Sequence, residues 1–453
     1  MQNSETQAPQ KDNKLGTMPV GKLLAVMSIP TMFSMLIQAL YNIVDSIFVS
    51  HYSEVALTAV SLAFPLQMLM FSFAVGTNVG VCSVISRRLG EKRFDEAEKA
   101  AQSGYTLVLI LTVVFALIGA FLSGPFFRLY TRETELLSLS TTYARICLML
   151  SLGTFVNIYC EKALMATGDT IHPMIIQASG AIFNVIFDPI LIFGYLGFPA
   201  MGISGAAIAT VAGQLFAMVL GIIFLKRNRN LNVKLLKPGL DGASVKDIVV
   251  VGLPAVIMQG IGTVMTSLMN AILITFDVLA TTVFGVYFKL QSFVFMPVFG
   301  LNSGVMPILG YNYGAKNRPR MMKALKMGLA VAILLMSLGT LFFNLFPDTL
   351  LGMFNASDTL RTMGEVALRT ISLSFPLAAV SVIFGALFQA MGDGYFSMIV
   401  SIVRQLFVLI PCAWLLGKIS GLDAVWYAFL VAESVALLLS IIFFRRELKK
   451  LNF

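Results

Sequence analysis

The 453-residue sequence predicts an all-α integral membrane protein, in which twelve transmembrane helices form two six-helix lobes related by a pseudo-two-fold axis. Three observations predict this fold. Apolar stretches recur along the whole chain, charged residues make up only 12% of it, and the second half repeats features of the first. An average soluble domain carries about twice that share of charged residues.

The apolar stretches are long enough to cross a bilayer. Hydrophobic residues make up 57% of the chain, and stretches such as 105–127 and 328–346 contain no charged residue. A membrane-spanning helix needs about 20 mostly apolar residues, and a soluble core cannot hide so many such stretches. We predict spans at 20–48, 57–85, 100–124, 138–164, 172–196, 202–226, 246–274, 280–310, 322–346, 364–390, 395–417 and 421–445.

Basic residues are distributed unevenly between the loops. They gather in the two tails and around 87–99, 226–246 and 316–326, whereas the alternate loops hold only Arg128, Arg132, Arg361 and Lys418. Because cytoplasmic loops are enriched in Lys and Arg, this pattern predicts a multi-pass protein of the cell membrane with both termini in the cytoplasm. The net charge of +9 then reflects topology, and we expect no nucleic-acid partner. Residues 1–19 lack the apolar core of a signal peptide and are expected to form a cytoplasmic tail.

The two halves repeat at a spacing of 224 residues. Pro30 matches Pro254, Gly76 matches Gly300, and Gly168-Asp169 matches Gly392-Asp393. Since each unit has an even number of spans, both insert the same way up, and a substrate site is expected between them. We expect an N-terminal lobe at 20–226, a cytoplasmic linker at 227–245, a C-terminal lobe at 246–446 and a cytoplasmic tail at 447–453.

Five motifs in order resemble the multidrug and toxic-compound extrusion (MATE) family, and its bacterial multidrug efflux members in particular. They read Tyr-Asn-Ile-Val-Asp at 41–45, Asn-Val-Ile-Phe-Asp-Pro at 184–189, Gly-Ile-Ser-Gly-Ala-Ala at 202–207, Leu-Gly-Tyr-Asn-Tyr-Gly-Ala-Lys at 309–316 and Arg-Gln-Leu-Phe-Val-Leu-Ile-Pro at 404–411. The resemblance extends from about residue 22 to residue 446.

The resemblance implies two lobes that form a V around a central cavity and work by alternating access. It implies a secondary-active antiporter that exports small organic cations or drugs as H⁺ or Na⁺ enters. No cofactor is expected beyond the coupling ion, and a monomer in contact with membrane lipid is expected. The alternative is a flippase for a lipid-linked or amphiphilic substrate in the same superfamily.

Two carboxylates in predicted spans are the leading candidates for ion coupling. A charged side chain at the centre of a bilayer costs about 2.5–3.5 kcal/mol on insertion scales, so Asp45 and Asp188 should face protein or water. We expect Asp45, Asn184, Asp188 and Thr210 to form a coupling site in the N-terminal lobe. Four oxygen-bearing side chains suit a hard cation such as Na⁺, whereas two nearby carboxylates could share a proton. Alternatively, these groups only hydrogen-bond one helix to another.

Other polar residues in predicted spans have more modest expected roles. Helical spacing places Gln38 and Tyr41 on the face of Asp45, and Gln177 on the face of Asp188. With Asn157, these are candidates for the substrate pathway. The C-terminal lobe has no counterpart of the carboxylate pair but carries Lys289, Arg404 and Glu433. We expect these three to form a structural charge network, with direct substrate contact as the alternative.

The motifs of other functional classes are missing from the sequence. The four cysteines have no spacing typical of redox or zinc sites. The sequence has no Walker A motif, and its predicted spans contain no catalytic constellation. A transporter is therefore expected rather than an enzyme, and a passive channel fits the two-fold repeat poorly.

Overall fold

The structure is a computed structural model that describes residues 13–228, 230–233, 237–354 and 357–450. Parts of the predicted tails and linker therefore lie outside the described residues. Within α2 and α3 and at the end of the last helix, the side chains of Asn42, Ile43, Asp45, Ser46, Ile47, Ser50, Glu54 and Lys450 also lie outside them.

The described residues form helices and no strands. The first half contains α1 (Lys14–Thr17), α2 (Val20–Tyr52), α3 (Glu54–Gly90), α4 (Phe94–Leu117), the π-helix η1 (Ile118–Leu122), α5 (Ser123–Arg128), α6 (Thr134–Met149), α7 (Leu152–Ala166), α8 (Ile171–Phe193), the 3-10 helix η2 (Tyr195–Gly197) and α9 (Ile203–Arg227). The second half contains α10 (Gly242–Leu273), α11 (Val278–Gly314), α12 (Arg318–Leu345), α13 (Pro347–Gly352), α14 (Asp358–Ser372), α15 (Phe375–Met391), α16 (Gly394–Ile402), the π-helix η3 (Val403–Leu409), α17 (Ile410–Ser420), α18 (Leu422–Val425) and α19 (Tyr427–Lys450).

Every predicted span coincides with a continuous helical segment or with a bent helix pair. In the described part of the chain, ten helices are long and apolar enough to cross a membrane, and two bent pairs bring the number to twelve if each pair is one span. The bent pairs are α6–α7, with an angle of 44°, and α14–α15, with an angle of 47°. The prediction of an all-α protein with twelve spans is confirmed, although the two bends were not predicted.

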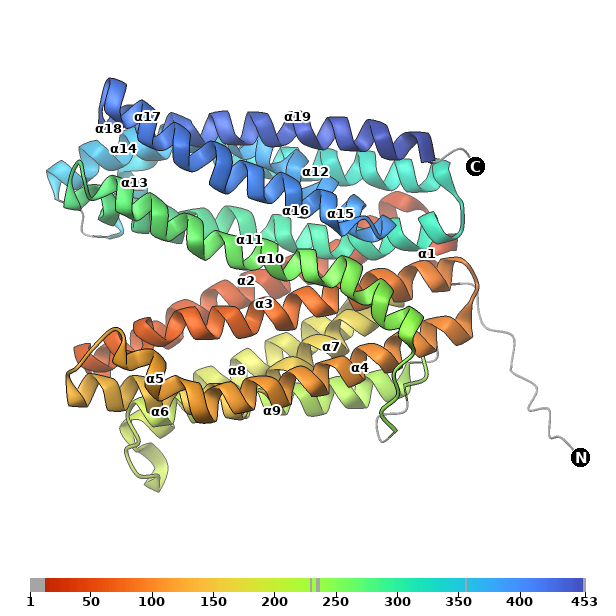
Figure 1. Cartoon of the computed structure of the whole chain (residues 1–453), viewed down its shortest axis with the longest axis horizontal. Coiled ribbons are helices and arrows are strands. Elements are labelled where there is room, and N and C mark those ends of the chain that lie inside the picture. Colours follow the sequence, from red (N-terminus) through yellow and green to blue (C-terminus); the bar gives the residue numbers. More distant parts are fainter. Residues whose placement is uncertain (1–12, 229, 234–236, 355–356, 451–453) are drawn as a thin grey trace, which may run out of the picture.

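The helices form two layers (Figure 1). We call α2–α9 the N-lobe and α10–α19 the C-lobe. Each lobe has its own cluster of buried apolar side chains. The first two turns of α2 and of α10 each pack into the other lobe. Leu23 and Met27 of α2 belong to the C-lobe cluster, and Ile248 of α10 belongs to the N-lobe cluster. The lobes are therefore joined at the start of each repeat.

Glycines allow the lobes to touch near one end of the molecule. This end, which we call the terminus end, carries α1 and the end of α19, and there the layers converge in Figure 1. A Cβ atom added to Gly80 would lie 2.3 Å from the backbone oxygen of Ile248, and one added to Gly300 would lie 2.5 Å from Cα of Met32. Only a residue without a side chain permits such an approach of two backbones.

Toward the opposite end, which we call the far end, three glycines of α10 and α11 have open space around them. Added Cβ atoms on Gly260 and Gly262 of α10, and on Gly285 of α11, would meet nothing within 4 Å. In Figure 1 the layers diverge in the same direction. The glycine contacts between the lobes therefore lie toward the terminus end. We use the term inter-lobe cleft for the region between the facing sides of the two lobes toward the far end.

Candidate functional site

Asp188 lies in the interior of the N-lobe with two of its predicted partners. Its side chain is fully buried, and the amide of Asn184 donates hydrogen bonds to Asp188 Oδ1 (3.2 Å) and to Thr210 Oγ1 (3.3 Å). Asn184 and Asp188 are one turn apart on α8, and Thr210 comes from α9. The structure therefore brings together three of the four residues predicted for the coupling site.

Small residues bring α8 and α9 close enough for these contacts. A Cβ added to Gly180 of α8 would lie 3.2 Å from the backbone oxygen of Gly213, and one added to Gly213 would lie 2.9 Å from that of Gly180. These glycines lie about one turn from Asn184 and Thr210, respectively. The close packing of the two helices therefore sets the distance across which Asn184 reaches Thr210.

The site is rich in oxygen atoms. Besides Asp188 and Thr210, it contains Asn184 Oδ1, which is buried without a hydrogen-bond partner among the described residues. Pro189 lies inside α8 and has no backbone N–H, so the carbonyl of Val185 lacks its helical partner. Oxygen ligands of this kind suit hard cations. The described residues contain no group of three or more His, Cys, Asp or Glu side chains that could hold a metal ion.

Asp45 lies on α2, which packs against α8, but its side chain is outside the described part of the structure. The backbone of α2 nevertheless shows at which level of α8 this position lies. Gln177 Nε2 donates a hydrogen bond to Gln38 Oε1 at 2.9 Å, which fixes the register of the two helices. Asp45 and Asn184 each follow this pair by seven residues, or about 10 Å of helix. Position 45 of α2 therefore lies at about the depth of Asn184, one helical turn before Asp188.

The predicted pathway residues occupy different surroundings. Gln38 and Gln177 form the bond described above, and Tyr41 is half-buried on α2. Asn157 of α7 is half-buried, and its Oδ1 atom has no partner among the described residues. One turn before it, the Thr154 hydroxyl donates to the side-chain oxygen of Gln214 on α9, a contact that the sequence did not reveal.

In the C-lobe, Arg404 and Glu433 form an ion pair, and Lys289 is not part of it. Arg404 Nη1 lies 2.7 Å from Glu433 Oε1, with 22% and 13% of the side chains exposed. Arg404 belongs to η3, and π-helical turns of this kind are frequent at functional positions. Lys289 is exposed and makes no hydrogen bond or ion pair with any described residue. The predicted three-member network is therefore a pair in the structure.

We expect the Arg404–Glu433 pair to stabilise the C-lobe. Arg404→Met leaves a mostly buried carboxylate without its partner, which should lower the free energy of unfolding by about 3 kcal/mol. Arg404→Met/Glu433→Leu removes both charges and should recover most of that loss. Thermal unfolding of the purified variants measures both effects. A double variant as unstable as the single one would contradict this interpretation.

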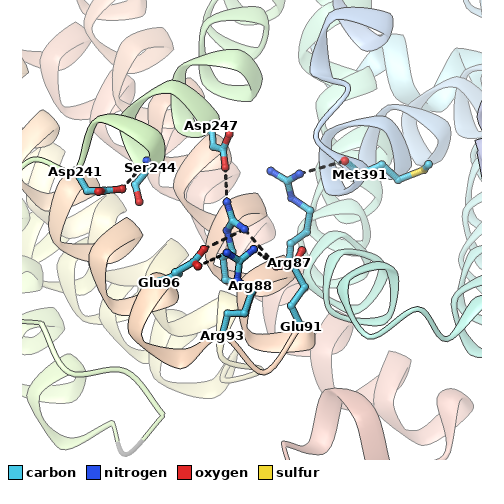
Figure 2. A network of polar contacts seen from close by, with 9 residues as sticks. All are labelled: Arg87, Arg88, Glu91, Arg93, Glu96, Asp241, Ser244, Asp247 and Met391. Atoms are coloured by element: carbon cyan, nitrogen blue, oxygen red, sulfur yellow. Dashed lines mark hydrogen bonds and ion pairs between the residues drawn. The ribbon is translucent and has the colours of Figure 1, made fainter.

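A second charged cluster joins the lobes at the terminus end (Figure 2). Arg88, near the end of α3, pairs with Asp247 of α10 at 2.8 Å and with Glu96 of α4 at 3.1 Å. Arg87 Nη1 donates to the backbone oxygen of Met391 on α15 at 3.3 Å. The sequence identified these arginines only as a sign of topology. In the structure they connect the end of α3 to two helices of the C-lobe.

Asp241 holds the start of α10 next to this cluster. Its carboxylate accepts a hydrogen bond from the backbone N–H of Ser244 at 2.8 Å and caps the helix. The pKa of Asp241 lies below its ordinary value, because the side chain and the backbone of Ser244 both hydrogen-bond to the charged form. The cap positions Asp247, less than two turns further along α10.

We expect the contact between Arg88 and Asp247 to favour closure of the terminus end. Asp247→Asn should weaken closure by about 1 kcal/mol, because both side chains are partly exposed. The ratio of open to closed molecules should then rise about fivefold. The reporter is Ser86→Cys in a cysteine-free background, since Ser86 is fully buried on α3 in the closed arrangement.

Glu96→Gln provides a matched control for this experiment. It also removes an ion-pair partner of Arg88, but one that comes from α4 of the same lobe. Thiol labelling of the reporter should therefore rise in Asp247→Asn and stay near the parent level in Glu96→Gln. Equal labelling of the two variants would show that the bond between the lobes has no special role.

Comparisons with known proteins agree with this architecture. The MatE family model matches residues 30–190 and 254–415, one match in each repeat. The chain is 26% identical over 418 residues to the FAD transporter of Shewanella oneidensis, covering 90% of this chain and 91% of that protein. It is 25% identical over 430 residues to the multidrug export protein MepA of Staphylococcus aureus, covering 93% and 92%. A multidrug resistance MATE family transporter solved in an outward-facing conformation matches with a TM-score of 0.92 and 26% identity, over 98% of this chain and 99% of that one.

Proposed function

The chain belongs to the MatE family of multi-pass membrane transporters, and from this premise we propose that it is an antiporter that exports small organic molecules, organic cations among them, in exchange for H⁺ or Na⁺. A family model that matches both repeats supports the transporter assignment. The multidrug export protein MepA and the FAD transporter are similar over nearly their whole lengths, which supports small organic molecules as the transported class.

The observation that carries the proposal is the buried carboxylate of Asp188 among oxygen atoms in the N-lobe. A carboxylate inside a membrane protein is costly and marks an ion or proton pathway unless it is fully neutralised. Asn184 and Thr210 complete a set of oxygens that could hold Na⁺, while the carboxylate itself could carry H⁺. We propose that one of these ions binds here, with Asp45 contributing from α2.

The inter-lobe cleft supports alternating access as the mechanism. The lobes touch through glycines at the terminus end, and the two layers diverge toward the far end (Figure 1). If both termini are cytoplasmic, as the Lys and Arg distribution predicts, this arrangement opens the cleft to the outside. An ion can shift such an equilibrium only by the difference between its affinities for the two states. We propose that ion binding at Asp188 supplies this difference.

Transport by the purified protein in proteoliposomes tests the proposal. A pH gradient and a Na⁺ gradient are imposed separately, with the fluorescent cation tetramethylrhodamine ethyl ester as cargo. We expect one gradient to drive saturable transport against the dye gradient. If neither gradient moves any of a panel of organic dyes, ion-coupled export of organic molecules is wrong for this protein.

A further inference from the structure

The C-lobe wall of the inter-lobe cleft carries a stripe of uncharged polar side chains. On α10, Gly252 and Val256 contact Gly80 and Gly76 of the N-lobe. The same face of the helix continues toward the far end at the helical repeat. The residues that follow on this face are Gln259, Thr263, Thr266 and Asn270. Gly260 and Gly262, which have open space around them, flank the start of this stripe.

Lys289 belongs to the adjacent wall on α11. Gly300 and Gly304 of this helix contact Met32 and Met27 of α2, and these contacts define the face that points at the N-lobe. Lys289 precedes Gly300 by 11 residues, or three helical turns, and therefore lies on the same face. The side chain is exposed, and Gly285, one turn further, has open space around it.

The position of Lys289 along α11 indicates which surroundings its exposed side chain requires. It lies 11 residues, or about 16 Å, from the start of α11 at Val278. It is the only charged residue between positions 278 and 315, and an ammonium group that faced lipid in such an apolar stretch would be costly. The ammonium group of Lys289 therefore requires water and belongs to the cleft. No described residue forms a hydrogen bond or an ion pair with it.

Most of the surrounding walls contain no acidic residue that could neutralise Lys289. The cleft-lining stretches 259–270 and 282–300 of the C-lobe, and 31–41 and 61–76 of the N-lobe, contain no Asp or Glu. Across the cleft, the next acidic position on α2 is Asp45. Phe293 and Met296 lie on the face of Lys289 and add apolar surface beside it. The wall thus combines one cation with neutral hydrogen-bonding and apolar side chains.

We infer that this wall binds an acidic group of the transported molecule, a carboxylate, sulfonate or phosphate, with Lys289 as its ion-pair partner. The stripe from Gln259 to Asn270 supplies hydrogen bonds, and Phe293 supplies contact with an aromatic body. The matching cargo is an amphiphilic organic anion, or a zwitterion that carries its acid next to an aromatic ring system. This inference rests on the proposed export of organic molecules and assigns their charge.

Two xanthene dyes of opposite charge provide the probe. Fluorescein is an anion near pH 8, and tetramethylrhodamine ethyl ester is a cation with a similar ring system. Binding to the purified protein is measured by fluorescence anisotropy without an ion gradient. Lys289→Met should weaken fluorescein binding by about tenfold or more, because a charge-assisted bond is lost. Binding of the cationic dye should stay the same or improve, and Lys289→Arg should keep fluorescein binding within about threefold of the parent.

Lys418→Met is the matched control. It removes the same charge from α17, where Lys418 Nζ lies 4.0 Å from the centroid of the Trp414 ring. Its neighbour Leu268 is on the side of α10 opposite the polar stripe. Fluorescein binding should be unchanged in this variant. If Lys418→Met and Lys289→Met weaken fluorescein binding by comparable amounts, the effect depends only on net charge, and the inference is overturned.

Three further outcomes would overturn it. In the first two, fluorescein binds Lys289→Met as tightly as the parent, or does not bind the parent at all. In the third, the effect of Lys289→Met vanishes in an Asp45→Asn background, which would assign Lys289 to Asp45 rather than to cargo. Because the assay uses no gradient, it is independent of ion coupling, and Asp188→Asn should still bind fluorescein. Failure here and failure of ion-coupled transport are therefore distinguishable.

Discussion

Asp188→Asn should abolish gradient-driven transport, by roughly a hundredfold or to background, while the protein still folds and binds its cargo. Asn has nearly the volume of Asp, and its side-chain oxygen can still accept the hydrogen bond that Asn184 donates to Asp188. The substitution therefore keeps the packing of a fully buried position but removes the charge that an ion or proton would neutralise. Without a charge that the ion or proton neutralises on binding, an ion gradient cannot shift the equilibrium between the two arrangements of the lobes.

Two measurements separate loss of coupling from loss of function. Uptake driven by the effective gradient should fall to background in Asp188→Asn. Exchange of labelled for unlabelled cargo with no gradient should continue, because it requires movement of the lobes but no net ion transport. Asp423→Asn, at an exposed position in α18, removes a carboxylate outside the site and should transport normally. Gradient-driven uptake in Asp188→Asn at the level of the parent would exclude Asp188 as the coupling group.

Thr210→Val refines the same experiment. It removes the hydroxyl that accepts a hydrogen bond from Asn184 at 3.3 Å and changes little in volume. If Na⁺ is the coupling ion, loss of one oxygen ligand should raise the Na⁺ concentration needed for half-maximal transport by about tenfold. If a proton on Asp188 is the coupling species, transport should change by less than about threefold.

The twelve spans were predictable because their signal is local. Each span is an apolar stretch long enough to cross a bilayer, and a single pass along the chain reveals it. The bends within 138–164 and 364–390 were not predictable in the same way. The first bend, between α6 and α7 at Leu150 and Ser151, lies in an apolar stretch without proline, and Gly153 just after it does not by itself predict an angle of 44°. The second precedes Pro376, whose effect could be foreseen in kind but not as an angle of 47°.

The candidate coupling site was predictable in part for the same reason. Asn184 and Asp188 are four residues apart on one helix, so helical spacing alone puts them on one face. Their contact with Thr210 was inferred and is present in the structure. The pair of Thr154 with Gln214 joins residues 60 apart, and the pair of Arg88 with Asp247 joins residues 159 apart. Such pairings depend on the packing of distant helices, which no local pattern encodes.

The same limit explains the outcome for Lys289. The sequence suggested that Lys289, Arg404 and Glu433, inside apolar spans of the C-lobe, neutralise one another. Arg404 and Glu433 do so, since η3 and α19 pack side by side. Lys289 lies on the face of α11 that also carries Gly300, which touches the other lobe. Only the position of the second lobe distinguishes a lysine in a cleft from a lysine in a charge network.

Gly90→Val should prevent the terminus end from closing and reduce transport by about tenfold or more. A Cβ added to Gly90 would lie 2.0 Å from the backbone oxygen of Tyr311, and one added to Gly314 would lie 2.1 Å from that of Arg87. Gly90 and Gly314 are equivalent positions of the two repeats, so the ends of α3 and α11 interlock through matching contacts. Both clashes involve backbone atoms, which cannot move aside as a side chain can. Relief requires the two helices, and with them the lobes, to separate.

Closure rather than folding should be the step affected, because each lobe keeps its own apolar core. Labelling of the Ser86→Cys reporter should therefore rise in Gly90→Val, while thermal unfolding changes little. Gly242→Val is the matched control, since Gly242 begins α10 at the same end of the molecule and an added Cβ there would meet nothing within 4 Å. Parent-like labelling and transport in Gly90→Val would show that the lobes tolerate a side chain at this contact. Equal defects in both variants would trace the loss to valine in a helix rather than to the interface. A rise in labelling confined to Gly90→Val would identify this interlock as the element that holds the terminus end shut while the far end of the cleft is open.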